Sequence, residues 1–299
     1  MRRLAFLAVP VDDVTTPEAL DWFAQAIARR SCAQVCTVNP EFVMAAQHNA
    51  AFRALLQAAP LCLPDGQGLL WAARLRGLKL RERVAGSSFV WRISERAAAD
   101  GWRIFLLGAA EGVAAAAAQA LCAAHPALRV VGTHSGSPHP DALAGILAQV
   151  HAAQPDVLLV AFGAPQQDLW IAANHMALAV PVMMGVGGAL DFVAGIAQRA
   201  PAWMQQQAVQ PFQAELLQPW RWRRMLALPQ FAWRRCRRSP DAGSSSQTRS
   251  TFPLICMCCK VCCSCWATQL TPCALYTQRM ASAWHLQRWP PPLMSKPRW

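Results

Sequence analysis

An acidic residue stands at the end of a short apolar run, in the sequence LPDGQG over residues 63 to 68. Asp65 lies between Pro64 and Gly66, and these residue types favour a tight turn from a strand into a helix. Such a turn would hold the Asp65 carboxylate at the rim of a sheet, where a single carboxylate is suited to take a proton from a hydroxyl group. The alternative is that Asp65 only caps the helix that begins at Gln67. The local sequence leaves both interpretations open.

Three other polar sequences also follow apolar runs directly. In parallel α/β sheets, ligands bind outside the carboxyl ends of the strands, where loops diverge and helix N-termini point free N–H groups at the ligand. We therefore expect all four sequences to meet at one edge of a sheet. Taken singly, their polar side chains have ordinary explanations as turn residues, a solvated helix side chain or a surface acid. The three sequences are TVNPE (37–41) with Thr37 and Asn39, FGAPQQD (162–168) with Gln167, and GVGGALDF (185–192) with Asp191.

Two glycine-rich stretches are weak signals for phosphate binding, because such loops also occur for packing alone. GVGG carries Gly185 and Gly187, and FLLGAAEG carries Gly108. Neither forms a GxGxxG motif at the first strand, which disfavours a nicotinamide-dependent dehydrogenase. The sequence also lacks a GxSxG elbow, a GKS or GKT loop and a DxD motif, and its seven histidines show no metal-ligand spacing. We expect neither a metal ion nor a cofactor.

Short strand-like runs alternate with longer helical patterns in the first two thirds of the chain. This alternation requires crossover connections, so it predicts an α/β fold with a mainly parallel sheet and helices on both faces. In the first helix Thr16 can be the cap, Pro17 suits the first position and Glu18 favours the positive end of the dipole. The expected strands are residues 4–10, 33–38, 61–63, 103–108, 128–133, 156–163 and 180–186.

Positive charge is concentrated at the end of the chain. Residues 1–218 hold 15 Lys or Arg and 15 Asp or Glu, so the formal net charge of +12 comes entirely from residues 219–299. Residues 219–238 interleave seven arginines with Trp and Phe, which favours a helix in the headgroup layer of an anionic membrane. A nucleic-acid patch is the alternative, since arginines and aromatic rings also suit phosphates and bases. The neutral charge balance of residues 1–218 favours the membrane.

Periodicity disappears near residue 239, and residues 239–299 contain seven of the 12 cysteines. We interpret this segment as a disordered tail. Clustered cysteines can bind zinc, but zinc ligands are usually paired across a folded loop, whereas six of these cysteines fall within ten residues. The predicted organisation is an α/β domain over residues 1–200, a basic Trp-rich membrane-binding appendage over 201–238, and the tail over 239–299.

The compartment is also indicated by the sequence. The five cysteines before residue 240 are scattered, which suggests buried thiols in a reducing compartment. We interpret the opening MRRLAFLAVPVDD as a strand rather than a signal peptide, because its apolar stretch is short and runs into two aspartates. No apolar stretch of the sequence qualifies as a membrane-spanning segment.

Seven motifs follow one another along the chain: TVNPEFV, LPDGQGLLWAARL, RERVAGSSF, FLLGAAEG, FGAPQQDLWI, GVGGALDFVAG and QRAPAWMQ. Any one of them is ordinary, but all seven in this order are specific. Together they resemble the WecG/TagA/CpsF family of bacterial glycosyltransferases, over about residues 3–238.

The resemblance implies a Rossmann-like α/β fold with a C-terminal helical appendage that closes the site near the membrane. It also implies an inverting, metal-independent hexosyltransferase. The donor would be a UDP-linked N-acetylmannosamine-type sugar and the acceptor a polyprenyl-diphosphate-linked N-acetylglucosamine, in polysaccharide or teichoic-acid-type synthesis. The protein would work in the cytoplasm, peripherally on the inner face of the cell membrane and without a nucleic-acid partner. A homo-oligomer is left open.

The resemblance also assigns roles to residues. Asp65 would be the general base, and Thr37 and Asn39 would line the same catalytic pocket. Inverting transfer needs one carboxylate to take the acceptor proton and no second, nucleophilic one. The departing diphosphate needs fixed cations or N–H dipoles where no metal is bound. The residues expected to bind the substrates are Arg83, Gly108, Gln167, Gly185, Gly187, Asp191, Arg221 and Arg224.

One stretch departs from the family pattern. Gln210 and Ala214 stand where the family usually has a glutamate and an arginine. One contact to the diphosphate would then be missing, so a catalytically impaired sugar-nucleotide-binding homologue is the alternative to an active transferase. A nucleic-acid-binding α/β protein is the third hypothesis.

Overall fold

Six parallel strands form the central sheet of this computed structural model, which describes residues 1–74 and 77–197. The strand order in the described part is β4-β3-β8-β7-β5-β6, and each neighbouring pair is parallel. The predicted α/β fold with a mainly parallel sheet is thereby confirmed. The strands are β3 (Ala33–Val38), β4 (Leu61–Pro64), β5 (Arg103–Gly108), β6 (Arg129–His134), β7 (Val157–Ala161) and β8 (Val182–Gly185).

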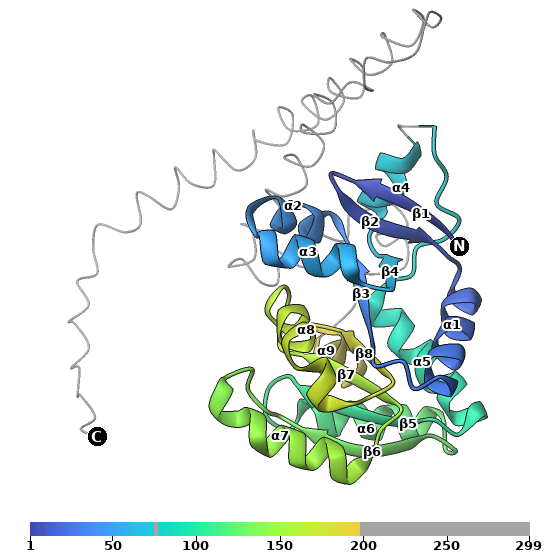
Figure 1. Cartoon of the computed structure of the whole chain (residues 1–299). Helices are drawn as coiled ribbons and strands as arrows, with labels where there is room; N and C mark the ends of the chain where they lie inside the picture. Colours follow the sequence, from blue (N-terminus) through green and yellow to red (C-terminus); the bar gives the residue numbers. More distant parts are fainter. Residues whose placement is uncertain (75–76, 198–299) are drawn as a thin grey trace, which may run out of the picture. The chain divides into compact units, whose positions relative to one another are not determined.

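Helices cover both faces of this sheet, as Figure 1 shows. Helices α1, α5, α6 and α9 pack on one face. On the other face, helices α2, α3 and α4 pack over β3 and β4. Helices α7 and α8 cover the rest of that face, over β5, β7 and β8. The helices are α1 (Thr16–Ala28), α2 (Pro40–His48), α3 (Ala50–Ala58), α4 (Gln67–Arg74), α5 (Gly86–Asp100), α6 (Val113–Ala124), α7 (Pro140–Ala153), α8 (Gln166–Leu178) and α9 (Ala189–Val193).

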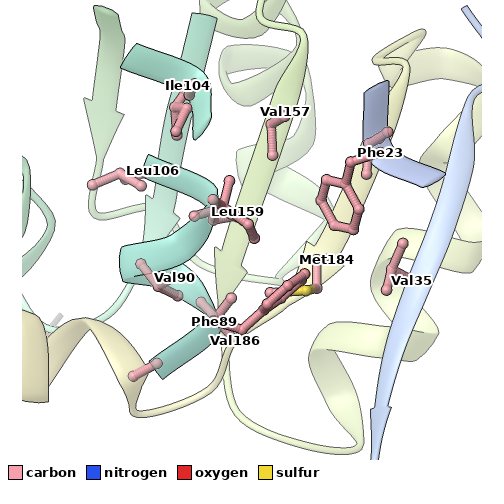
Figure 2. Close-up of a cluster of buried hydrophobic side chains, with 14 of the residues drawn as sticks. Phe23, Val35, Phe89, Val90, Ile104, Leu106, Val157, Leu159, Met184 and Val186 are labelled. Carbon is pink, nitrogen blue, oxygen red and sulfur yellow. The ribbon is translucent and has the colours of Figure 1, made fainter. Parts of the chain in front are cut away.

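The two faces of the sheet bury alternate side chains of each strand. Leu61 and Leu63 belong to the cluster under α1 and α5, whereas Cys62 faces the opposite cluster. Figure 2 shows the first cluster, in which the ring of Phe23 from α1 meets the ring of Phe89 from α5 edge to face at 5.6 Å between centroids. Because both faces are buried, the strands appear in the sequence as continuous apolar runs rather than alternating ones.

The start of the chain differs from its prediction. The single strand expected over residues 4–10 is a hairpin of two antiparallel strands, β1 (Arg2–Phe6) and β2 (Val9–Asp13), outside the six-stranded sheet. Leu7 and Ala8 make the turn with positive φ values of 51° and 67°. Tight hairpin turns of this kind usually carry Gly, Asn or Asp, so their absence hid the turn in the sequence.

Buried charge ties this hairpin to β4. The Asp12 carboxylate is almost fully buried and accepts hydrogen bonds from Nε and Nη2 of Arg3 at 2.7 and 2.8 Å. The same carboxylate accepts the backbone N–H of Cys62 at 2.8 Å. Since charge-assisted bonds of this kind are among the stronger ones in proteins, they fix the strand that leads directly to Asp65.

The cap of α1 also lies one residue earlier than predicted. Thr15, not Thr16, accepts the N–H of Glu18, while the Glu18 side chain accepts the N–H of Thr15. This reciprocal capping box needs the spacing T-x-x-E, which only Thr15 has relative to Glu18. The side chain of Thr16 is therefore free to make a different contact, with Glu82.

Several predictions fall outside the described residues. They concern the domain boundaries at residues 200 and 238, the basic segment 219–238, the tail 239–299, and the residues Gln210, Ala214, Arg221 and Arg224. Among the helices that the structure does describe, none has the length and apolar character needed to cross a membrane.

Candidate active site

The four polar sequences lie at the carboxyl ends of four strands that are neighbours in the order β4, β3, β8 and β7. β3 continues into α2 on one face of the sheet, and β8 continues into α9 on the opposite face. In open α/β sheets, ligands bind where two neighbouring strands lead into helices on opposite faces. The expectation that these sequences meet at one edge is confirmed.

Asp65 stands at this edge, directly after β4. Its backbone N–H donates to the carbonyl of Val38 at 2.8 Å, which joins the ends of β4 and β3. Its Oδ2 accepts the N–H of Gly86, the first residue of α5, at 3.4 Å. The bond therefore runs to α5 and not to α4, the helix that Asp65 precedes in the chain. The N-terminal end of a helix carries partial positive charge, which favours a carboxylate there.

Several opposing influences act on the Asp65 carboxyl. Burial raises its pKa above the ordinary value for Asp, because water no longer solvates the charged form well. The N–H of Gly86, the charge of Arg83 and the N–H of Gly66 oppose this rise. The result is a carboxylate that is more basic than a solvated Asp and lies near a guanidinium. A more basic carboxylate is better suited to accept a proton near neutral pH.

Thr37 and Asn39 flank Asp65 from the end of β3. A methyl group placed on Gly86 would lie 3.5 Å from Cγ2 of Thr37 and 3.8 Å from Oδ2 of Asp65, so these three residues surround one small space. Asn39 caps α2 by accepting the N–H of Phe42 with Oδ1 at 2.9 Å. Its ordinary structural explanation therefore holds for Oδ1, and Nδ2 is the group left to meet a ligand.

Arg83 approaches the same carboxylate from the loop before α5. Its side chain is partly buried, and its positive charge acts on Asp65. Among residues 1–74 and 77–197 its guanidinium forms no salt bridge. A guanidinium that forms no salt bridge is suited to bind a phosphate.

Gln167 lies across the end of β8. Its side chain is buried, with 2% of the residue exposed, and its Oε1 accepts the N–H of Gly187 at 2.9 Å. A methyl group on Gly185 would come within 2.6 Å of its Nε2. The lack of a side chain at Gly185 therefore leaves room for Gln167, and the backbone N–H of Gly187 donates a hydrogen bond to it. The alternative explanation of Gln167 as a solvated helix side chain is wrong.

Gly108 and Asp191 lie at the margins of this group. Gly108 ends β5 with a φ of +94°, and a methyl group there would meet the carbonyl oxygen of Ala161 at 2.8 Å, so packing alone requires glycine. Asp191 is in the first turn of α9, and its Oδ2 lies 3.5 Å from where a methyl group on Gly188 would be. Within residues 1–74 and 77–197 neither residue forms a hydrogen bond or salt bridge with Asp65, and their substrate contacts stay predictions.

Two residues of this region were not singled out from the sequence. Gly86 was part of a quoted motif, and its signal was a glycine at a helix start with no capping side chain before it. Asp168 is fully buried, and neither carboxylate oxygen has a hydrogen-bond partner among the described residues. Burial raises the pKa of Asp168 to about 7, because water no longer solvates the charged form. Its sequence context gave no signal of burial.

A metal ion would need a cluster of His, Cys, Asp or Glu side chains. In the described ranges no group of three or more such residues is arranged to hold a metal ion. The groups that could meet an anionic ligand there are the Arg83 guanidinium and the Gln167 amide.

The parallel sheet and the polar residues at the carboxyl ends of its neighbouring strands, Asp65 among them, define the class as an α/β protein with a ligand site at that edge. The family model described as "Glycosyl transferase WecG/TagA/CpsF family" matches residues 4–243, and the chain belongs to this family. The glycosyltransferase class expected from the motifs is thereby confirmed.

Curated relatives carry a more specific name. A protein of Bacillus subtilis (strain 168) is 32% identical over 200 residues, which are 67% of this chain and 77% of the relative. One of Bacillus spizizenii is 30% identical over 197 residues, covering 66% of this chain and 76% of its own. One of Staphylococcus aureus (strain MRSA252) is 28% identical over 201 residues, covering 67% and 78%. All three are named N-acetylglucosaminyldiphosphoundecaprenol N-acetyl-beta-D-mannosaminyltransferase.

Proposed function

We propose that this protein transfers an N-acetylmannosamine-type sugar from a UDP donor to a polyprenyl-diphosphate-linked N-acetylglucosamine, with inversion at the anomeric carbon. The observation that carries the proposal is the Asp65 carboxylate, held at the N-terminus of α5 beside Arg83 and Thr37. The sugar and the acceptor are supported by the names of the relatives. The polymer made would be a polysaccharide or a teichoic-acid-type polymer.

The chemical step uses Asp65 as the general base. Its carboxylate takes the proton of the acceptor hydroxyl as that oxygen attacks the anomeric carbon. The new glycosidic bond forms on the face opposite the leaving group, and the bond between the anomeric carbon and the UDP oxygen breaks. UDP keeps the electron pair of that bond. The raised pKa of Asp65 suits this role, since a stronger base removes the proton more readily.

The departing diphosphate is stabilised by fixed groups. Arg83 supplies a cation near Asp65. The bond from the Gly187 N–H to Oε1 fixes the orientation of the Gln167 amide, and Nε2 is the atom of this amide that would donate to the diphosphate. The Gly187 N–H is therefore engaged in this structure, and Gly185 and Gly187 act through Gln167. Arg221 and Arg224, from the segment outside the described residues, would complete the anion site. With these groups the transfer is proposed to be metal-independent.

The lipid-linked acceptor places the reaction at a membrane surface. We assign membrane binding to residues 219–238, which carry seven arginines together with Trp and Phe. Each arginine near an anionic surface contributes roughly 1 kcal/mol before salt screening. Truncation after Leu217 should release the protein from anionic liposomes, whereas truncation after Ser239 should not. Equal retention of both truncated chains would contradict the assignment. On this assignment, the protein is peripheral on the inner face of the cell membrane.

The function is tested by an assay with purified full-length protein, several UDP-sugars and a short-chain lipid-diphosphate N-acetylglucosamine. We expect transfer from the N-acetylmannosamine donor, with the inverted anomeric configuration in the product and with the same rate in the presence of EDTA. Donor binding without transfer or hydrolysis would identify a catalytically impaired homologue. A strict need for added magnesium or manganese would show that the leaving diphosphate is stabilised by a metal ion.

A further inference from the structure

The loop that carries Arg83 is held in place by side chains from the hairpin and from the start of α1. We propose that the contact between Thr16 and Glu82 positions Arg83 for the transfer reaction, so that Thr16 and Glu82 are positioning residues of the active site. This inference rests on the proposed function, in which Arg83 meets the diphosphate of the donor.

Glu82 is bound by the first residue of α1. Its Oε2 accepts the backbone N–H of Thr16 at 3.0 Å, and its Oε1 accepts the Thr16 hydroxyl at 2.5 Å. A carboxylate at a helix N-terminus also gains from the helix dipole. Two hydrogen bonds to one residue fix both the position and the orientation of the Glu82 side chain.

Arg81, the residue before Glu82, is held by residues of both the hairpin and α1. The backbone N–H of Arg81 donates to Oδ1 of Asp13 at 2.8 Å, and its guanidinium donates to the Asp13 carbonyl at 2.6 Å. The guanidinium also binds both carboxylate oxygens of Glu18, at 2.8 and 2.6 Å. The backbone just before Glu82 is therefore anchored independently of Glu82.

The residue after Arg83 is anchored to the catalytic turn itself. Val84 is buried, and its N–H donates at 2.8 Å to the carbonyl of Pro64, the residue before Asp65. Arg83 thus lies between Glu82, which is tied to α1, and Val84, which is tied to the end of β4. With both neighbours fixed, the remaining freedom of Arg83 is mainly that of its own side chain, which reaches the vicinity of Asp65.

The Glu82 contact is not required to cap α1. Thr15 and Glu18 already form a complete capping box there. The contact therefore links two parts of the molecule, α1 and the Arg83 loop, which are 66 residues apart in the chain. A misplacement of about 1 Å in a group that contacts the reacting substrate can cost about 100-fold in rate. A link of this kind is accordingly expected to show in catalysis more than in folding.

The test uses Thr16→Val, which removes the hydroxyl donor and keeps the shape of the side chain, and Glu82→Gln, which removes the charge. In the full-length protein we expect kcat/KM to fall about 10-fold or more, with Tm within a few degrees of wild type. The acid limb of the kcat/KM profile should move to higher pH, because a displaced Arg83 no longer lowers the pKa of Asp65. Thr16→Ser, which restores the hydroxyl, should recover wild-type behaviour.

Two further variants make the result specific. Glu95→Gln removes an exposed ion pair between Glu95 and Arg92 on α5 and should leave activity unchanged. Arg83→Gln should lower kcat/KM strongly, and adding Thr16→Val to it should cause little further loss, since both act through one group. Additive losses in that double variant would overturn the proposal, as would unchanged activity in Thr16→Val while Arg83→Gln is impaired. Full activity of Arg83→Gln would instead refute the role that the proposed function gives to Arg83.

Discussion

The N–H of Gly86 donates a hydrogen bond to Oδ2 of Asp65 at 3.4 Å, across 21 residues of sequence. This contact places the carboxylate at the start of α5, a helix with no capping side chain of its own. In place of a local cap, the helix end holds the residue proposed to act as base. A Cβ at this glycine would lie between Thr37 and Asp65, 3.5 to 3.8 Å from their side-chain atoms.

Gly86→Ala should give a folded but impaired enzyme. The added methyl group would lie at ordinary van der Waals distances, 3.5 Å from Thr37 and 3.8 Å from Asp65, so the fold can accept it. It would nevertheless fill the space where the acceptor hydroxyl must approach Asp65. We expect a Tm within a few degrees of wild type and a loss of about 10-fold or more in kcat/KM. As a control, Gly145→Ala in the middle of α7, where nothing lies within 4 Å, should remain fully active.

Gly185→Ala should act through Gln167. Its methyl group would come within 2.6 Å of Nε2 and 2.9 Å of Cδ and Cγ of Gln167, so that side chain must move and lose its bond to Gly187. We expect a destabilisation of about 1–3 kcal/mol, typical of overpacking, measured by denaturant unfolding. We also expect a marked loss of transfer. Combining Gly185→Ala with Gln167→Ala should relieve the overpacking but not restore activity, and an active Gly185→Ala enzyme would contradict this role of Gln167.

Asp168 should make stability depend on pH. Its pKa is about 7 in the folded protein, above that of an unfolded Asp, because burial disfavours the charge. Between these two pKa values the folded state binds more protons than the unfolded state, so stability falls as pH rises. From about pH 5 to about pH 8, wild type should lose roughly 1–3 kcal/mol more than Asp168→Asn. The measurement is denaturant unfolding of both proteins at several pH values, and parallel curves would show that Asp168 is not the group responsible.

The strands of the sheet could largely be predicted from the sequence. Residues 33–38 and 103–108 were predicted with the bounds that β3 and β5 have, because strands buried on both faces are continuous apolar runs bounded by turn residues. The polar residues after these runs were predicted at strand ends for the same reason. The hairpin was missed because Leu7 and Ala8 adopt positive φ without the residues that usually signal it.

The contacts within the site could not be predicted in the same way. That β4, β3, β8 and β7 lie side by side depends on long-range pairing, which no local pattern encodes. The approach of Gly86 to Asp65 depends on how α5 packs against the sheet. The burial of Asp168 and Gln167 was hidden because FGAPQQD has the composition of a solvated helix start. These residues become visible as a site once the chain is folded.

The central claim is that Asp65 is the base of an inverting transfer, and Asp65→Asn tests it most directly. The amide keeps an oxygen that can accept the Gly86 N–H, but it cannot take the acceptor proton. The measurement is the single-turnover rate of sugar transfer to the lipid-linked acceptor, with donor affinity measured on the same protein. The account predicts a loss of about 10²- to 10⁴-fold in rate with donor binding nearly unchanged. A rate within a few-fold of wild type would contradict it.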